Sequence, residues 1–303
     1  METSSAIKTQ NRALASVLLL LTTFFWGITF TIVKDAVALV DVFVFLAQRF
    51  ILAFALIIPI ALLRGGRPNL NQLRDGLVLG VLLFASYAFQ TMALRFTTAS
   101  NTGFLTGLSV VFVPMISALA LGQRFAPQLL IGVGSAVAGL FLLCTNGAWS
   151  FNSGDLLAAT CAVCIAIHLI LTGRYSRHPD NNIYWLTTIQ LGAVALLSAA
   201  TAAVGGHPLQ NVHPDTVWAT IICALFATIF AFLVQTSMQR YISPAKTALI
   251  FCTEPVFAAI YAWIAAGERL GPIALSGALL ILAGMLIAEG ILPWRRAGMV
   301  SDD

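Results

Sequence analysis

The chain carries very little charge for its length. Only 9% of its 303 residues are charged, whereas 59% are hydrophobic. A soluble domain carries about 25% charged residues, so this composition excludes an ordinary soluble protein and indicates an integral membrane protein. The net charge of +4 comes from residues clustered at the ends of apolar stretches rather than on one basic face. We therefore expect no nucleic-acid partner.

The sequence also lacks the motifs of enzymes and metal sites. It has neither an aspartate-rich diphosphate motif nor the His-Glu-x-x-His pattern of zinc enzymes. Cys161 and Cys164 are spaced like a redox or zinc pair, but they lie in an apolar stretch without a second ligand pair, where cysteine behaves as a small hydrophobic residue. We predict no enzyme activity, no catalytic residue, no metal and no cofactor.

What the chain has instead is a series of apolar stretches, each long enough to cross a bilayer as a helix. Turn residues separate them, and no intervening loop is long enough to fold alone. Any site for a small-molecule substrate must therefore lie between helices within the lipid bilayer. We expect ten transmembrane helices near residues 13–33, 42–63, 75–95, 101–122, 127–145, 154–173, 183–204, 215–239, 246–267 and 271–292.

The second half of the chain repeats the first at a fixed offset of 145 residues. The matched pairs are Gln90 and Gln235, Arg95 and Arg240, Gly122 and Gly267, Arg124 and Arg269, Pro127 and Pro272, Gly132 and Gly277, and Gly139 and Gly284. Each half holds five apolar stretches, and this odd number makes the second copy enter the membrane from the opposite side. We therefore predict an all-α integral membrane protein of ten transmembrane helices, built as two inverted five-helix repeats at 13–145 and 154–292.

The distribution of Lys and Arg predicts the orientation. With the N-terminus inside, three basic residues fall on the outer side, namely Lys34, Arg95 and Arg269, and Arg49 lies within a span. The inner side holds the other twelve: Lys8, Arg12, Arg64, Arg67, Arg74, Arg124, Arg174, Arg177, Arg240, Lys246, Arg295 and Arg296. This bias predicts a multi-pass protein of the bacterial inner membrane with both termini in the cytoplasm.

Several short motifs resemble the EamA family of the drug/metabolite transporter (DMT) superfamily. The most specific is Glu254-Pro-Val-Phe-Ala258 followed by Gly267-Glu-Arg-Leu270. The others are Trp26-Gly-Ile-Thr-Phe30, Gln48-Arg-Phe50, Ala93-Leu-Arg95 after Gln90, Gly154-Asp-Leu-Leu157, and Gln239-Arg-Tyr241 after Gln235. The resemblance implies ten helices in two inverted repeats, a central substrate cavity and alternating access. It also implies export, since many members export metabolites or amino acids.

Glu254 is the most informative single residue. A lone carboxylate inside the hydrocarbon region needs a partner, a cavity or a proton. It either accepts a proton or binds a cation as part of the cavity, or it is fixed structurally by neighbouring helices. Pro255 and Pro114 are expected helix breaks, because proline cannot donate to the carbonyl four residues earlier. At the repeat offset Ser109 and Val110 stand where the second half has Glu254 and Pro255.

Four further polar or charged residues lie within the expected spans. His168 either bonds a neighbouring helix or carries protons together with Glu254, since its ordinary pKa lies near neutrality. Gln90 and Gln190 either hold helices together or contact a polar substrate headgroup. Arg49 has a long stem that reaches the outer surface by snorkelling, or else it binds an anionic substrate group.

Aromatic residues complete the set of candidates. Trp26, Tyr87, Phe104 and Tyr261 belong to spans one, three, four and nine, which border the cavity in the fold that the resemblance implies. Each is either packing or a cavity wall.

We therefore predict a secondary-active transporter that exports a small metabolite such as an amino acid by alternating access. Proton coupling and a homodimer in contact through spans five and ten are options. The alternatives are a facilitative, channel-like permease and a membrane-embedded enzyme.

Overall fold

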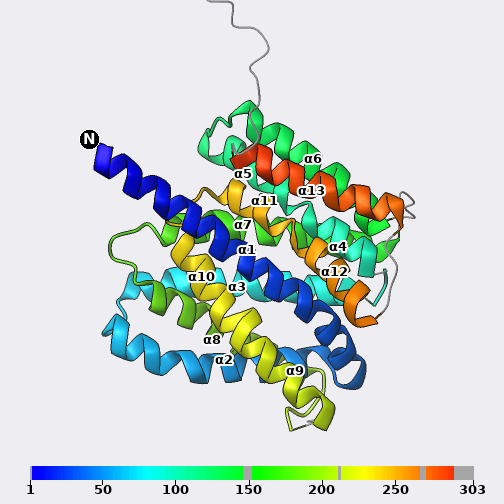
Figure 1. Cartoon of the computed structure of the whole chain (residues 1–303). Helices are drawn as coiled ribbons and strands as arrows, with labels where there is room; N and C mark the ends of the chain where they lie inside the picture. The colour runs from blue at the N-terminus through cyan, green and yellow to red at the C-terminus, as the bar shows by residue number, and fades with distance from the viewer. Residues whose placement is uncertain are drawn as a thin grey trace, which may run out of the picture.

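The computed structural model describes residues 2–93, 95–97, 99–145, 152–210, 213–266 and 271–289, and these are almost entirely helical (Figure 1). The helices are α1 (Glu2–Leu39), α2 (Val42–Gly65), α3 (Leu70–Ala93), α4 (Ala99–Gly107), α5 (Ser109–Leu121), α6 (Pro127–Thr145), α7 (Ser153–Tyr175), α8 (Ile183–Val204), α9 (Pro214–Ala224), the π-helix η1 (Leu225–Phe230), α10 (Ala231–Met238), α11 (Pro244–Phe251), α12 (Glu254–Ala266) and α13 (Pro272–Glu289).

Within the described ranges nine helical segments are long and apolar enough to cross a membrane, one fewer than expected. The difference lies at 246–267, which is not one continuous helix. It is divided into α11 and α12 by a turn at Cys252 and Thr253. Pro255 explains the division, because it cannot donate a hydrogen bond back to Phe251 and its ring crowds that carbonyl. Proline in the first turn of α12 is tolerated, since the N–H there has no helical partner.

The matching span of the first half is also interrupted, but not at the expected residue. Pro114 lies inside α5, and the break between α4 and α5 lies at Leu108. The expected break at Pro114 is therefore wrong in position by six residues. No proline stands near Leu108, and the preceding Gly107 is closely packed: a Cβ added to it would lie 2.8 Å from the side chain of Leu140.

The offset of 145 residues reappears in the helix bounds and in two contacts. Helices α4, α5 and α6 begin at Ala99, Ser109 and Pro127, and helices α11, α12 and α13 begin 145 residues later, at Pro244, Glu254 and Pro272. Two residue pairs with this separation touch each other. Ser135 Oγ donates to the carbonyl oxygen of Leu280 at 2.8 Å, and Cys252 Sγ lies 3.7 Å from the carbonyl oxygen of Gly107.

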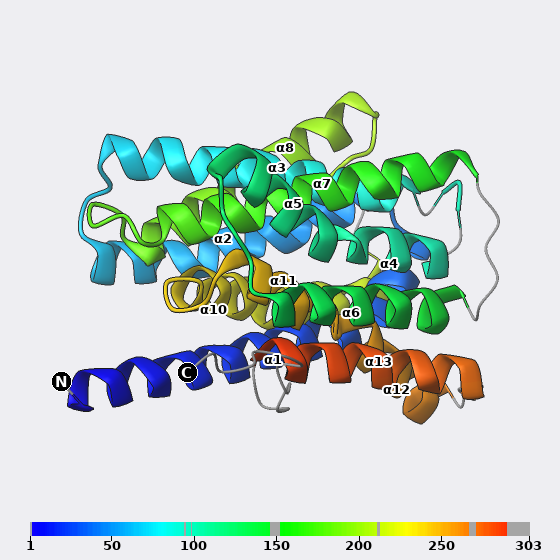
Figure 2. The ribbon, with the colours of Figure 1, turned by 90° about the horizontal axis from the view of Figure 1, so that it is seen from above.

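Helices α6 and α13 lie side by side in both views (Figures 1 and 2). Their backbones meet at glycines: a Cβ on Gly139 would lie 2.5 Å from the oxygen of Gly277, and one on Gly132 would lie 2.6 Å from that of Gly284. Small residues allow this close approach. Because residue numbers rise along one helix where they fall along the other, the two helices run antiparallel. These glycine faces are thus occupied within one chain.

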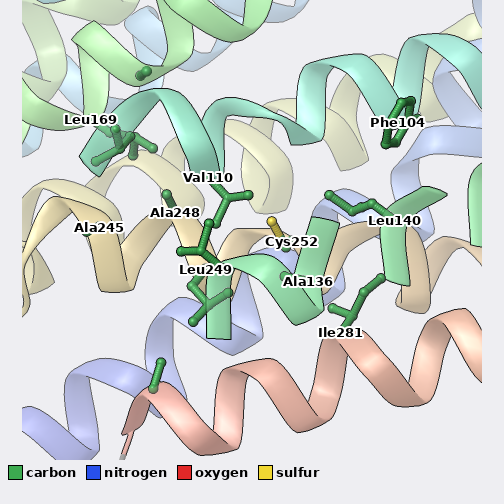
Figure 3. Close-up of a cluster of buried hydrophobic side chains, with 14 of the residues drawn as sticks. Phe104, Val110, Ala136, Leu140, Leu169, Ala245, Ala248, Leu249, Cys252 and Ile281 are labelled. Atoms are coloured by element: carbon green, nitrogen blue, oxygen red, sulfur yellow. The ribbon is translucent and has the colours of Figure 1, made fainter. Parts of the chain in front are cut away.

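Two large apolar clusters hold the helices together. One joins α4–α7 with α11–α13 and includes Val110, Leu140, Leu249 and Ile281 (Figure 3). The other joins α2, α3, α8 and the α9–η1–α10 segment around Phe50 and Leu191. Helix α1 packs on α12 and α10 and thereby connects the two groups. The polar residues considered below lie along this connection.

Candidate functional site

Glu254 stands at the break between α11 and α12, directly against α1. A Cβ added to Gly27 would lie 2.8 Å from the carbonyl oxygen of Glu254 and 2.7 Å from Cβ of Phe257. Only glycine allows this approach without displacing backbone. The hydroxyl groups of Thr23 and Thr253, 3.1 Å apart, join the two helices one turn away. The Trp-Gly and Glu-Pro motifs, more than 200 residues apart in the sequence, therefore meet in space.

The carboxylate of Glu254 has no fixed partner among the described residues. No hydrogen bond or ion pair joins its side chain to any of them, although its neighbours Thr253 and Val256 are buried. Glu254 is half-buried, and its carboxylate oxygens are not among the fully buried polar atoms that lack a hydrogen bond. An accessible carboxylate held by backbone alone is suited to bind a proton or a cation.

Trp26 reaches from α1 to the π-helix. Its Nε1 donates to the carbonyl oxygen of Ala227 at 2.9 Å, and its ring lies edge-on to Phe251 at 4.9 Å between centroids. The ring of Phe232 lies 5.8 Å away. π-Helical turns occur frequently at functional sites, since they redirect backbone groups out of the regular ladder. Trp26 therefore connects the α11–α12 break to η1.

Arg49 reaches the same carbonyl from α2, contrary to the expectation that it snorkels outward. It is 3% exposed and lies against η1. Its Nε donates to Thr228 Oγ1 at 2.7 Å, and its Nη2 donates to the oxygen of Ala227 at 3.0 Å and to the hydroxyl of Tyr87 at 3.4 Å. Tyr87 thereby joins α3 to this group. Of the two alternatives, surface anchoring is excluded by this burial.

His168 and Gln190 form a second polar group on the other side of Phe232. The Nε2 of His168 lies 3.0 Å from Oε1 of Gln190, and Nε2 of Gln190 donates to Thr236 Oγ1 at 3.4 Å. All three residues are buried, and they link α7, α8 and α10. The rings of His168 and Phe232 are 6.3 Å apart. This geometry matches an interhelical link.

Comparison with known proteins agrees with this arrangement. Residues 13–145 and 152–289 each match the EamA-like transporter family. The chain belongs to this family. It is thus a multi-pass membrane protein of a transporter family, as its motifs suggested.

Relatives within the EamA-like transporter family span nearly the whole chain. An "Uncharacterized transporter" of Archaeoglobus fulgidus is 32% identical over 280 residues, which cover 92% of this chain and 86% of the relative. A "Probable amino-acid metabolite efflux pump" of Escherichia coli is 25% identical and covers 93% and 96%. A solved structure, titled only "Crystal structure of protein", has a TM-score of 0.76 at 22% identity over 92% of this chain and 97% of that one. The last likeness concerns the fold alone.

The remaining candidates stand apart from the groups around Glu254 and His168. Phe104 packs in the apolar cluster beside Leu140, with its ring edge-on to Phe141 at 5.7 Å (Figure 3). Gln90 and Tyr261 are half-buried, and no side-chain hydrogen bond or ring contact joins either side chain to another described residue. Of the proposed cavity-wall aromatics, Trp26 and Tyr87 contact the polar groups described above.

The sequence reasoning missed Thr228 and η1 altogether. Thr228 Oγ1 also donates to the carbonyl oxygen of Cys223, five residues earlier, which is the spacing of a π turn. The stretch Leu225–Phe230 contains neither glycine nor proline. A composition signal for this turn is therefore lacking, and Thr228 is one of many threonines in the apolar spans.

Proposed function

We propose that this protein is a secondary-active exporter of a small metabolite such as an amino acid, working by alternating access. The observation that carries the proposal is the accessible Glu254 carboxylate at a helix break, against the close contact with Gly27. Discontinuous helices with free backbone groups form the substrate and ion sites of many secondary transporters. The efflux-pump names of relatives that cover nearly the whole chain support the same function.

The proposal includes ten membrane passes in two inverted five-helix halves. The equal spacing of helix starts and the antiparallel contact of α6 with α13 support it. Loops expected on one side also contact each other: Arg95 and His207 both approach Asp41, whereas Arg177 and Arg240 bond the opposite group of loops. With the positive-inside bias, both termini lie in the cytoplasm, in a bacterial inner membrane. The homodimer stays a prediction.

Glu254 is the proposed proton-coupling group. A carboxylate in an apolar setting without a fixed partner changes its charge when it takes up a proton, and this change can be linked to closure of the site. Its position at the α11–α12 break, against Gly27 of α1, supports this role, because a change of charge there would act on the contact between two packed segments.

Reconstitution in proteoliposomes tests the function. Wild-type protein is expected to give saturable counterflow and, with an imposed pH gradient, accumulation of an exported amino acid. Glu254→Gln should abolish gradient-driven accumulation and retain exchange. Glu289→Gln, a carboxylate at the end of α13 that pairs with Lys246 at 3.5 Å, is the matched control and should retain both. Non-saturating flux would indicate a channel-like permease, and unchanged coupling in Glu254→Gln would exclude the coupling role.

A further inference from the structure

Arg49 is a buried cation without a described anionic partner. No carboxylate of the described residues lies within 4.0 Å of its guanidinium, and every group that it bonds is neutral: the Thr228 hydroxyl, the Ala227 carbonyl and the Tyr87 hydroxyl. An uncompensated charge inside a membrane protein is costly, and such residues mark substrate or ion paths. Among the described residues, only neutral groups thus bond the guanidinium of Arg49.

Not all N–H donors of the guanidinium are engaged by described residues. Of its nitrogens, Nε and Nη2 are engaged, whereas Nη1 donates to no described residue. Nη1 is also not fully buried, since it is absent from the fully buried polar atoms without a hydrogen bond. The N–H groups on Nη1 are therefore accepted by no described residue.

The neighbours of Arg49 fix its orientation. The guanidinium carbon lies 5.4 Å from the ring centre of Phe50 and 5.5 Å from that of Tyr87, and the Thr228 bond holds Nε in place. A planar guanidinium held in one orientation suits a carboxylate, which takes two parallel N–H bonds from it. An ammonium group, by contrast, would be repelled.

Arg49 is connected to the Glu254 site through one carbonyl. The oxygen of Ala227 accepts from both Arg49 and Trp26, and the residue after Trp26 is Gly27, which touches Glu254. A cation and a carboxylate thus flank the Trp-Gly segment of α1. We propose that Arg49 binds the carboxylate of the transported compound, so that the substrates are amino acids and related carboxylates. This inference rests on the proposed export function.

Efflux of matched compounds tests the assignment. Proteoliposomes are loaded with the twenty amino acids together with the corresponding amino-acid amides, in which a neutral carboxamide replaces the carboxylate. The exported compounds are identified by mass spectrometry. We expect wild-type protein to export free acids in preference to amides. Arg49→Gln should lower the export of acids about 10- to 100-fold, as expected for one lost charge-assisted interaction, and leave the slow export of amides unchanged.

Two further variants separate binding from folding. Arg64→Gln changes an exposed arginine at the end of the same helix and should retain the wild-type ratio of acids to amides. Arg49→Lys keeps the charge but not the planar fork; it should raise the half-saturating concentration of acids about tenfold without affecting amides. A purely structural role would change acid and amide export alike.

The outcomes separate the two proposals. The assignment of Arg49 is wrong, while the export function stands, if wild-type protein exports amides as fast as acids. The same holds if Arg49→Lys keeps the full preference for acids. If wild-type protein exports none of the compounds under any gradient, the export function is wrong and this assignment falls with it.

Discussion

Arg95 and Arg240 occupy the same position in the two halves of the chain, yet they are held very differently. Arg240 Nε donates to the carbonyl oxygen of Ser176 at 2.7 Å, and its Nη2 lies 3.4 Å from that of Asn181. Arg95 makes a single long contact, 3.5 Å from Asp41, and 62% of its side chain is exposed. The loop of Arg240 is thus bonded through its arginine, whereas the loop of Arg95 is bonded mainly through Thr97, which donates to Asp155 Oδ1 at 2.8 Å and accepts from Asn152 Nδ2 at 2.7 Å.

The loops at the Arg240 end bond in both directions. Arg177 donates to the carbonyl oxygens of Arg240 at 3.1 Å, Gln239 at 2.7 Å and Ile242 at 2.7 Å. Partial burial lowers the pKa of Arg177 from its ordinary value, but an arginine stays charged at neutral pH. A cavity of about 330 Å³ lies beside these two arginines.

The difference indicates what must change during transport. A carrier that opens to alternate sides passes through states in which equivalent contacts are made at one end and broken at the other. In this structure Arg95 makes an exposed ion pair, whereas two carbonyl oxygens accept hydrogen bonds from Arg240. Weakening the bonds of Arg240 should therefore favour the opposite state, whereas changes at Arg95 should have little effect.

The largest effect is expected for Asp75→Ala. Asp75 is 3% exposed and accepts from Nδ2 of Asn181 at 2.8 Å, which fastens α3 to the loop that Arg240 bonds. Loss of this charge-assisted bond should lower the free energy of unfolding by about 2–3 kcal/mol. Thermal unfolding in detergent measures it. Asp75→Asn keeps the shape and one acceptor but not the charge and should cost less than Asp75→Ala; full stability in Asp75→Asn would contradict the role of the charge.

A smaller effect is expected for Arg240→Ala. Its guanidinium bonds two carbonyls but is itself exposed, so the free energy of unfolding should fall by about 1–2 kcal/mol. The same energy shifts the balance between closed and open loops about 5- to 30-fold. Ser176 is buried and small, so a cysteine at this position reports on opening of the loops. In a protein without the five native cysteines, labelling of Ser176→Cys by a water-soluble maleimide should be faster when Arg240→Ala is also present.

Arg174→Ala is the control for that measurement. Arg174 lies at the exposed end of α7, two residues before Ser176, and its side chain bonds no described residue. Labelling equal to the parent protein is expected there. If Arg174→Ala raises labelling as much as Arg240→Ala does, general loosening of the loop explains the result and the Arg240 bonds are not what holds it.

The sequence predicts much of this arrangement, and its errors have physical reasons. Apolar length locates nearly every span, because the lipid bilayer imposes it. Pro255 predicts the break in the second half correctly, whereas Pro114 lies inside α5 and does not mark the break at Leu108. Hydropathy also does not say toward which neighbour a helix turns its face. For this reason the sequence alone leaves open whether Arg49 reaches the outer surface or faces the interior.

The candidate site was only partly predictable. Residue type singled out Glu254, His168 and Gln190, because polar groups are rare in apolar spans. Their partners come from tertiary contacts: the carbonyl of Ala227 is exposed to Trp26 and Arg49 by a π turn that no residue type announces. The repeat predicts similar backbones in the two halves. The side chains that differ between the halves determine which hydrogen bonds and ion pairs each half makes.

The smallest effect is expected for Arg95→Ala, and it tests the comparison most directly. A solvent-exposed ion pair contributes about 0.2–1 kcal/mol and is screened by salt. The melting temperature should therefore barely change, and it should not change at all at high ionic strength. His207, whose Nε2 lies 3.6 Å from the same Asp41 carboxylate, retains a contact there. If Arg95→Ala instead destabilises the protein as much as Arg240→Ala, the two ends are equally strong, and the asymmetry in their bonding does not reflect different roles during transport.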